Sequence, residues 1–274
     1  MTTNLKSTAA VSRTLADQDL LRFAERVSNA QDNGHTIPLL SEEIPGMNVA
    51  DGYAIQTLLR HITIGRGARL VGWKIGLTSR AKMVQMNVFE PAIGFLTDDM
   101  ARPENSSITV ADMIHPRVEC EIAFVMKHAL HGPNCTKEQV LSATDFVLPA
   151  VEVIDSRFEA YRFDLCSVIA DNSSSARFVT GGRARYATEL DLRTLGVAIE
   201  INGEVVATGA SAAVLGHPAE AIAHLVNILH SQGEHLAAGS FVMSGGITEA
   251  LPVKAGDQVV ARFQELGSVA MRFI

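Results

Sequence analysis

Cysteine, aromatic residues and charged residues are all scarce in this chain of 274 residues. The three cysteines, Cys120, Cys135 and Cys166, show no C-x-x-C spacing and no even-numbered framework, so we interpret them as reduced thiols that serve as small apolar side chains. Aromatic residues make up only 5%, which is few for a protein that binds by ring stacking. Charged residues make up 19% with a formal net charge of -7, which argues against a nucleic-acid-binding protein.

Long apolar runs are also missing from the sequence. No run approaches the ~18 consecutive apolar residues that a membrane span needs. The N-terminal segment MTTNLKSTAAVSRTLADQ lacks the apolar region of a signal peptide. We therefore expect a cytoplasmic protein without membrane contact. With 47% hydrophobic residues and 21 glycines, the chain can bury the substantial core of a compact enzyme.

The N-terminal part of the chain predicts helices. Apolar residues recur at helical spacing over 17–30 and again over 48–66, where Asp51 is a candidate N-cap or first-turn acid. Beyond this part, apolar runs become short, rich in β-branched residues and separated by Gly, Pro and Asn, as in a mainly β domain. We divide the chain into an N-terminal helical region, 1–70, and a mainly β catalytic domain, 71–274.

The clearest turn signal is the dipeptide Asn202-Gly203. It predicts a hairpin whose strands run over 196–201 and 204–209. A helix is predicted over 218–232, where apolar residues again recur at helical spacing. A further helix is expected at 78–86, and further strands at 70–76, 95–100, 240–248, 258–264 and 268–274.

Two carboxylates interrupt an otherwise apolar stretch, IHPRVECEIAFV at 114–125. Because successive residues of a strand point to opposite faces, Glu119 and Glu121 share one face and the apolar residues around them share the other. Like charges on one face repel each other, and burying either carboxylate without a partner is costly. Oxygen ligands suit Mg²⁺ or Mn²⁺ better than zinc. From this stretch alone, a solvent-facing edge strand that carries two glutamates is an equally good interpretation.

A third carboxylate stands in the apolar stretch DFVLPAVEVIDSRF at 145–158. Glu152 is the lone charge inside that run and therefore needs a partner. Either a metal shared with the two glutamates above or a salt bridge to Arg157 or Arg177 would supply one. Three carboxylates in two neighbouring strand-like segments favour the metal. Asp155 and Arg157 are expected to form a structural ion pair at the end of the strand.

Lys74 lies within the short predicted strand LVGWKIG. It is either a surface lysine that extends its stem over apolar neighbours or a cation held in a pocket for a substrate carboxylate. Farther on, Ser173, Ser174 and Ser175 lack the G-x-S-x-G frame of a serine nucleophile. Hydroxyl and backbone N–H groups in such a turn could hold a carboxylate, or could equally satisfy the turn itself.

Five motifs occur in order along the chain: GWKIGLTSRAKMVQM, HPRVECEIAFV, PAVEVIDSRF, ADNSSSA and SGGIT. They resemble the 2-oxo-4-pentenoate hydratase and decarboxylase family of the fumarylacetoacetate hydrolase superfamily. The resemblance implies an α+β fold, namely a mixed, mainly β sandwich or roll of the fumarylacetoacetate hydrolase C-terminal type with an N-terminal helical region. It also implies a homo-oligomer and a Mg²⁺ or Mn²⁺ ion held by Glu119, Glu121 and Glu152. The lysine of the family's G-x-K-x-G motif falls on Lys74.

The segment Pro91-Ala92-Ile93-Gly94 bears on the reaction. Hydratases of this family carry Pro-Asp-x-Gly, whose Asp serves acid–base work, whereas Ala92 cannot move a proton. The resemblance therefore implies decarboxylation of 2-oxohex-3-enedioate to 2-hydroxypenta-2,4-dienoate and CO₂ in catechol meta-cleavage. It also implies association with the hydratase that takes up this product. Two alternatives stay open: a hydratase of 2-hydroxypenta-2,4-dienoate with another proton donor, and a non-catalytic partner of a hydratase.

In the implied mechanism the metal chelates the 1-carboxylate and 2-oxo oxygens of the substrate. As a Lewis acid it stabilises the dienolate that forms as the distal carboxylate leaves. Three carboxylates leave a divalent metal site with one net negative charge, so a nearby cation is needed to receive a dianionic dicarboxylate. Lys74 is our first candidate, with Arg80 and Arg157 as alternatives. By resemblance, the expected contacts to the substrate carboxylate or oxo group are Ser173, Ser174 and Thr248.

Overall fold

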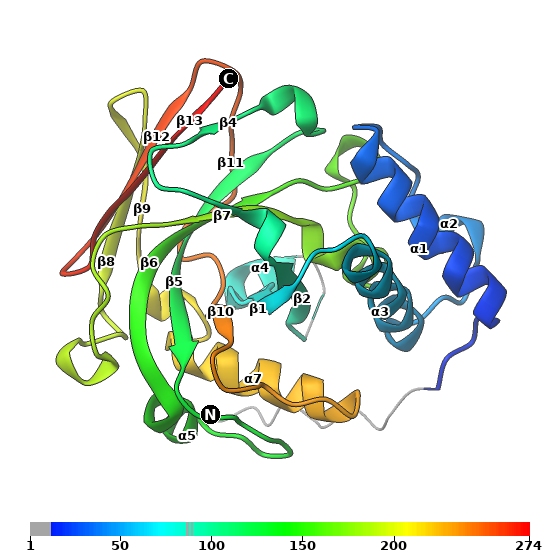
Figure 1. Cartoon of the computed structure of the whole chain (residues 1–274), viewed down its shortest axis with the longest axis horizontal. Coiled ribbons are helices and arrows are strands. Elements are labelled where there is room, and N and C mark those ends of the chain that lie inside the picture. The colour runs from blue at the N-terminus through cyan, green and yellow to red at the C-terminus, as the bar shows by residue number, and fades with distance from the viewer. Residues whose placement is uncertain (1–11, 86–87, 89) are drawn as a thin grey trace.

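The computed structural model describes residues 12–85, 88 and 90–274, which form two sheets, with the N-terminal helices on the side of the molecule away from the smaller sheet (Figure 1). The larger sheet consists of β1 (Leu70–Gly76), β2 (Ala92–Thr97), β3 (Ala101–Arg102), β5 (Arg117–Met126), β6 (Thr144–Ile154), β7 (Ser175–Thr180), β10 (Phe241–Met243) and β11 (Leu251–Pro252). Its order is β2-β1-β10-β5-β6-β7-β3, and β11 pairs with β5. The smaller sheet consists of β4 (Ser107–Ile108), β8 (Gly196–Ile201), β9 (Glu204–Ala210), β12 (Gln258–Phe263) and β13 (Gly267–Phe273). Its order is β4-β13-β12-β8-β9.

The larger sheet is rolled up. The rings of Phe178 on β7 and Phe241 on β10 stack with their centroids 5.0 Å apart, although β5 and β6 lie between these strands. Because neighbouring strands are ~4.8 Å apart, this contact requires strong curvature. Asn172 helps to close the roll: its carboxamide accepts a hydrogen bond from the Phe95 N–H (2.8 Å) and donates one to the Phe95 carbonyl (3.0 Å).

The helices are α1 (Asp17–Asp32), α2 (Leu40–Glu43), α3 (Val49–Gly65), α4 (Arg80–Gln85), α5 (Lys137–Ala143), α6 (Leu165–Ala170) and α7 (Pro218–Ser231). In Figure 1, α1, α2 and α3 gather on one side of the molecule, with α7 running below the sheet. Asn48 caps α3 in a capping box with Asp51, which confirms Asp51 as a first-turn acid.

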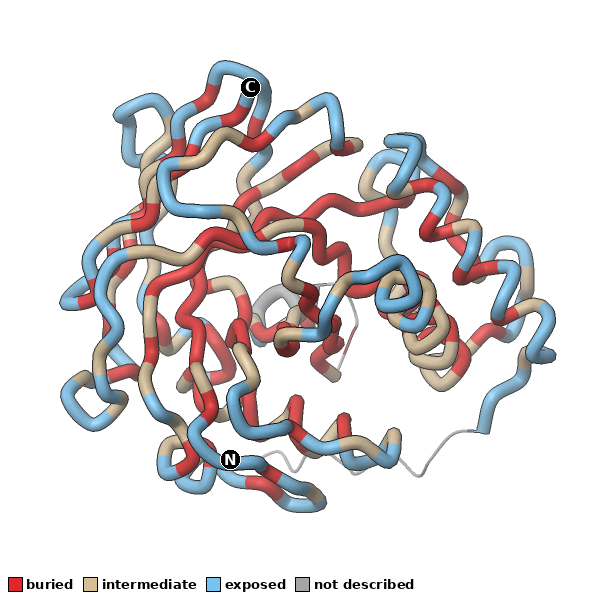
Figure 2. Tube along the Cα trace, in the orientation of Figure 1, coloured by how far each residue is buried: buried red, intermediate tan, exposed pale blue. Residues whose placement is uncertain are grey.

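A single apolar core joins the N-terminal helices to the sheets. Phe23 of α1 and Ile55 of α3 belong to the same cluster of buried residues as Ile75 of β1. Figure 2 shows buried residues both along the strands and on α1 and α3. The division of the chain at residue 70 therefore stays a prediction, because the packing is continuous across it.

One helical stretch departs from the expectation of no membrane-length apolar run. Among the described residues, Ser211–Ser231 is long and apolar enough to span a membrane by length and composition alone. It contains α7, and 56% of the tested window is buried inside the fold. Leu225, Val226 and Leu229 of α7 are fully buried. This burial is typical of a helix in a protein core.

The hairpin β8–β9 confirms the turn predicted at Asn202-Gly203. The prediction succeeded because the turn type depends on the two turn residues themselves. The predicted strand at 240–248 is too long: β10 ends at Met243, where the chain turns through Gly245 (φ 109°). The strand predicted at 95–100 begins earlier, at Ala92. Met86, at the end of the predicted helix 78–86, lies outside the described residues, as does the stretch 1–11.

The three cysteines are free thiols, as predicted. Burial raises the pKa of the Cys120 thiol to about 12 and that of Cys166 to about 11. Such thiols stay protonated at neutral pH and are poor nucleophiles.

Candidate metal and substrate site

Three carboxylates meet on one face of the rolled sheet. In the antiparallel pair β5–β6, Glu119 lies directly opposite Glu152, and Glu121 follows two residues along β5 on the same face. Each residue offers an oxygen, and the three oxygens lie within 4.8 Å of one another. Glu121 and Glu152 are buried and Glu119 is half-buried. The predicted clustering is confirmed, and the interpretation as a solvent-facing edge strand is wrong.

Lys74 lies on the same face as the carboxylates. It is opposite Met243 on β10, which in turn is opposite Ala123 on β5, so all three point to one side of the sheet. Its side chain is 4% exposed, and Nζ lies 3.1 Å from Oε2 of Glu152. Nζ also donates a hydrogen bond to the carbonyl oxygen of Ser173 (3.0 Å).

These contacts decide two open alternatives. Lys74 is not a surface lysine, because its ammonium group is enclosed by protein. The ion-pair partner of Glu152 is Lys74, so the alternative of a salt bridge to Arg157 or Arg177 is wrong. β1 is far from β6 in the sequence, so this pairing depends on the strand order of the folded sheet.

The charges of the cluster do not balance by themselves. Burial lowers the pKa of Lys74, but the carboxylates of Glu152, Glu121 and Glu119 outweigh burial and leave this pKa above its usual value. Lys74 is therefore a cation. Burial, followed by repulsion from Glu152, raises the pKa of Glu121 well above its usual range. If all three carboxylates were ionised, the cluster with its one ammonium group would carry two net negative charges, and this repulsion is part of why the pKa of Glu121 is raised.

The residues present fit a divalent cation. Oε2 of Glu152 is buried and has no hydrogen-bond partner within the described part of the chain, although the Lys74 ammonium is near. The other oxygen, Oε1, accepts a hydrogen bond from Ser175 Oγ (3.1 Å). Glu121 Oε2 accepts one from the Gly245 N–H (2.7 Å). A doubly charged ion with oxygen ligands would neutralise the cluster and complete the coordination of these oxygens.

The turn that follows α6 shapes one wall of the site. Asn172, Ser173 and Ser174 are consecutive non-glycine residues with left-handed backbone angles (φ 51°, 50° and 58°). L-residues adopt this conformation at a cost, so such a run is held by its surroundings and is found at functional sites. Ser173 Oγ donates to the Ile93 carbonyl (3.1 Å), and Ser174 Oγ donates to Asp171 (3.3 Å).

The hydroxyl groups of Ser173 and Ser174 are engaged within the protein. Both hydroxyl protons are used within the protein, and Ser173 supplies a backbone carbonyl to Lys74 rather than its hydroxyl. The hydroxyl that reaches the carboxylate cluster is that of Ser175. A role for Ser173 and Ser174 as substrate contacts stays a prediction.

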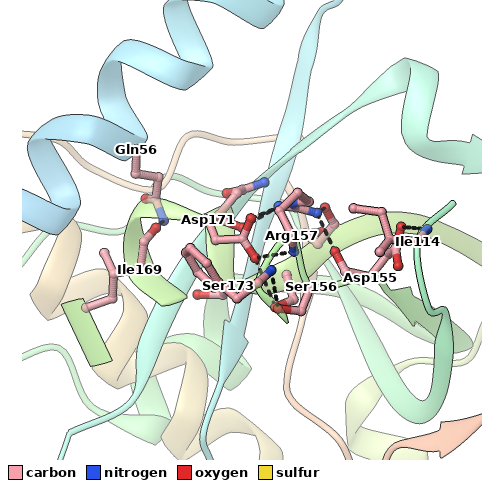
Figure 3. Close-up of polar contacts among 12 residues, drawn as sticks. Gln56, Ile114, Asp155, Ser156, Arg157, Ile169, Asp171 and Ser173 are labelled. Atoms are coloured by element: carbon pink, nitrogen blue, oxygen red, sulfur yellow. Dashed lines mark hydrogen bonds and ion pairs between the residues drawn. The ribbon is translucent and has the colours of Figure 1, made fainter. Parts of the chain in front are cut away.

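Figure 3 shows the buried ion pair that anchors this turn. Arg157 is fully buried and pairs with Asp171, and it also donates to the carbonyl oxygens of Asp155 (2.7 Å) and Ser175 (3.2 Å). The expected ion pair between Asp155 and Arg157 is therefore wrong. The Asp155 carboxylate instead accepts the N–H groups of residues 114 and 115. Arg157 is thus engaged inside the protein and cannot receive a substrate.

Asp171 is a structural residue that sequence reasoning missed. It lies inside ADNSSSA, where an acidic residue before serines is typical of a turn, and its partner, Arg157, stands 14 residues earlier. Burial raises the pKa of Asp171 to about 6, and the Arg157 guanidinium opposes that rise. The pair fixes the start of β7 relative to the end of β6, and with it the position of Ser175 beside Glu152.

The loop after β10 closes the other side of the cluster. A Cβ atom on Gly246 would lie 3.0–3.1 Å from the carboxylate atoms of Glu119, so the glycine lets the backbone approach that side chain. Thr248 is buried, and its Oγ1 accepts a hydrogen bond from the Cys120 N–H (3.2 Å), between the two β5 glutamates. The structure therefore places Thr248 next to the strand that carries the site.

The segment with Ala92 lines the same face. Ala92 is opposite Gly76, and Gly94 is opposite Lys74. A Cβ atom on Gly94 would lie 2.7 Å from the Asn172 carbonyl oxygen and 3.2 Å from Cγ of Lys74, which explains the glycine. Ala92 is buried and contributes only a methyl group to this face.

Two further arginines, Arg80 and Arg117, differ in their position relative to the carboxylate cluster. Arg80, an alternative for substrate binding, is exposed at the start of α4. Arg117 was not predicted to have a role, although its place two residues before Glu119 puts it on the same face of β5. Its guanidinium lies over the ring of Tyr161, with Cζ 4.0 Å from the ring centroid. The alternation of HPRVECEIAFV already contained this signal.

Known proteins resemble this chain over nearly its whole length. The model of the fumarylacetoacetate (FAA) hydrolase C-terminal family matches residues 62–274. The chain belongs to this family. Within it, a 4-oxalocrotonate decarboxylase of Pseudomonas sp. (strain CF600) is 52% identical over 264 residues, which cover 96% of this chain and 100% of the relative. A 2-oxo-hept-4-ene-1,7-dioate hydratase of Escherichia coli is 36% identical over 260 residues, covering 92% of this chain and 97% of the relative.

A solved structure shows the same fold. The 4-oxalocrotonate decarboxylase of Pseudomonas putida G7, complexed with magnesium and adipate, superposes with a TM-score of 0.94 at 50% identity. The match covers 96% of this chain and 100% of that one. The predicted fumarylacetoacetate hydrolase fold, with a rolled sheet and N-terminal helices, is confirmed.

Proposed function

We propose that this protein is a metal-dependent 4-oxalocrotonate decarboxylase, which converts 2-oxohex-3-enedioate to 2-hydroxypenta-2,4-dienoate and CO₂ in catechol meta-cleavage. The observation that carries the proposal is the buried cluster of three carboxylates and Lys74, in a chain that is 52% identical to one such decarboxylase over nearly its full length. Burying these charged groups destabilises the fold, and a non-catalytic partner protein would gain no function from them.

Glu119, Glu121 and Glu152 would hold Mg²⁺, or Mn²⁺, through carboxylate oxygens. The ion supplies Lewis-acid stabilisation of the negative charge that develops on the 2-oxygen of the substrate. Lys74 keeps Glu152 in place by its ion pair, and its positive charge adds to the field at the same point. With the ion bound, the charges of the three glutamates, Lys74 and the metal sum to zero.

The substrate is a vinylogous β-keto acid, so the protein needs no covalent nucleophile. The electrons of the bond to the leaving carboxylate pass along the conjugated chain to the 2-oxygen. The residues hold the 2-oxo acid end in place and exclude water from it, since Lys74, Glu121 and Glu152 are almost fully buried. The relative from Pseudomonas putida G7 binds adipate, a saturated dicarboxylate with the same number of carbons as this substrate.

Thr248 is the best-placed of the three predicted substrate contacts. Its oxygen accepts the Cys120 N–H, which leaves the hydroxyl proton available to donate to a carboxylate or oxo oxygen. Ser173 and Ser174 would act through the backbone of their turn, because their hydroxyl protons are already engaged.

We further propose that the protein is cytoplasmic, forms homo-oligomers and associates with the 2-oxo-4-pentenoate hydratase that takes up its product. The family resemblance supports these assignments. The edge strand β9 also exposes Val205 (60%) and Val206 (42%), an apolar surface of the kind that other chains cover. Light scattering after gel filtration, with and without the hydratase, tests both associations.

Hydration of 2-hydroxypenta-2,4-dienoate is the second candidate, because hydratases such as the Escherichia coli relative share 36% identity with this chain. Ala92 opposes it, because the hydratases of the family that this chain resembles carry an acid–base Asp in that segment. The deciding experiment measures CO₂ release from 2-oxohex-3-enedioate with Mg²⁺ and then with excess chelator. Release that stops on chelation supports the decarboxylase. If no CO₂ appears with Mg²⁺ present, the proposal fails, and solvent incorporation into a 4-hydroxy product would identify a hydratase.

A further inference from the structure

Among the described residues, the two buried cations considered for substrate binding, Lys74 and Arg157, are both engaged within the protein. Lys74 is already engaged by Glu152 and the Ser173 carbonyl, and Arg157 is paired with Asp171. A divalent metal with Lys74 only balances the three glutamates. The second carboxylate of a dicarboxylate substrate therefore needs a further positive group on this face of the sheet.

Arg117 is on that face, beside the glutamates. It lies two residues before Glu119 on β5, opposite Ile154 of β6, so the two side chains start about 6.6 Å apart along the strand. An extended six-carbon dicarboxylate, with five carbon–carbon bonds between its carboxyl carbons, spans a similar length. Within the described part of the chain, the Arg117 guanidinium forms no ion pair and no hydrogen bond, and its prominent contact is the ring of Tyr161.

The neighbours of Arg117 also await a polar partner. The Tyr161 and His115 rings lie 4.6 Å apart, and the Tyr161 hydroxyl and His115 Nε2 are both buried without a hydrogen-bond partner among the described residues. Buried polar atoms without partners are rare in native proteins, so two of them beside a free guanidinium point to a missing polar ligand. Ala160 and Tyr161 both adopt left-handed backbone angles (φ 52° and 57°), the kind of strain found at functional sites.

We propose that Arg117, with Tyr161 and His115, forms the subsite for the distal carboxylate of the substrate and makes the enzyme specific for dicarboxylates. This inference rests on the proposed decarboxylation and specifies how the site selects its substrate. The guanidinium binds the carboxylate through charge-assisted hydrogen bonds, while the Tyr161 ring holds the guanidinium from behind.

The subsite also suits release of the product. The bond between C5 and C6 breaks, and its electron pair moves through the chain to the 2-oxygen, which then takes one proton from solvent to give the 2-hydroxydienoate. C6 leaves as neutral CO₂, with no proton or oxidant required at that carbon. A guanidinium that binds a carboxylate tightly has little affinity for an uncharged molecule, so Arg117 retains the substrate and releases CO₂.

Two saturated ligands test the subsite by calorimetry with Mg²⁺ present. 2-Oxohexanedioate and 2-oxohexanoate share the 2-oxo acid end and chain length, and lack the double bond that would conduct the electrons of decarboxylation. Arg117→Met should weaken binding of the dicarboxylate about 10- to 100-fold and leave the monocarboxylate nearly unchanged. Tyr161→Phe keeps the ring and should cost less. Arg177→Met is the matched control, because half-buried Arg177 lies opposite Val153 on the other face.

The outcomes separate this subsite from the proposed function. Equal losses for both ligands in Arg117→Met, or no loss for either, would overturn the subsite. Arg117→Lys keeps the positive charge and should retain part of the preference for the dicarboxylate over the monocarboxylate. This variant replaces Arg117→Met in the test if the methionine variant does not fold. With 2-oxohex-3-enedioate, Arg117→Met should raise KM far more than it lowers kcat. If the wild type binds neither 2-oxo acid, the proposed function itself fails. If it binds both equally, the subsite alone is wrong.

Discussion

Replacing Glu121 by glutamine should separate the stability of the metal-free protein from its response to Mg²⁺. Glu121 is 1% exposed, and burial, then Glu152, raises its pKa well above the usual value. Glutamine has nearly the same shape and can still accept the hydrogen bond from the Gly245 N–H. The substitution therefore removes one titrating group and one candidate metal ligand without opening a cavity.

The expected effect on the metal-free protein follows from proton linkage. A carboxyl group with a raised pKa in the folded state binds its proton more tightly when folded. Its contribution to stability is complete below the unfolded-state pKa of about 4.5 and is lost as the pH rises toward the folded-state pKa. For one proton the slope is at most about 1.4 kcal/mol per pH unit, or about 3 to 6 °C in Tm. Glu121→Gln should abolish this dependence of the unfolding free energy on pH. At pH 8 the metal-free variant should therefore be more stable than the metal-free wild type.

With Mg²⁺ present, the substitution should lower the stability relative to the wild type instead of raising it. At 100 times Kd, a bound ion stabilises the wild type by about 2.7 kcal/mol, and the variant should lose most of that gain because it lacks a charged ligand. Differential scanning calorimetry from pH 6 to 8, in chelator and in Mg²⁺, measures both effects. Glu204→Gln, on the exposed strand β9, should behave as the wild type. A Glu121→Gln protein with the wild-type pH slope and the wild-type Mg²⁺ shift would mean that Glu121 neither causes the pH dependence nor binds the ion.

Three further substitutions test other parts of the site. Glu152→Gln should lower turnover of 2-oxohex-3-enedioate at limiting Mg²⁺ by at least about 100-fold with an unchanged circular dichroism spectrum, and wild-type rates would exclude Glu152 as a ligand. Lys74→Met should cost the metal-free protein about 3–5 kcal/mol in urea unfolding because Glu152 loses its counter-ion. Unchanged kinetics would remove Lys74 from the site. Gly94→Ala should destabilise by about 1–3 kcal/mol through its contact with Asn172, whereas Gly65→Ala, with open space around it, should not.

Alternation along two strands made the carboxylate cluster predictable. A period of two places Glu119 and Glu121 on one face whatever the rest of the fold, and the lone charge of Glu152 in an apolar run marks the neighbouring strand. The hairpin at Asn202-Gly203 and helix α7 were equally accessible, because turn chemistry and helical spacing are local.

Contacts between distant segments were not accessible in this way. Lys74 meets Glu152 only because β1 pairs with β10, and β10 with β5, an order that no short stretch encodes. The same limit made the Asp155–Arg157 prediction wrong: spacing along the chain suggested neighbours, whereas the folded turn brings Asp171 to Arg157. The division at residue 70 stays a prediction, since the core is continuous across that point.

The ion pair between Lys74 and Glu152 has a consequence for how the enzyme acquires its metal. Because a lysine from another strand offsets part of the repulsion among the glutamates, we expect the chain to fold before any ion arrives. Structural zinc sites differ, because there the ion drives folding itself. In this protein, chelation should remove the ion and leave the protein folded. Adding the ion back should then restore activity without any refolding step. Metal availability could then set the active fraction of a stable enzyme pool within the time of ion exchange.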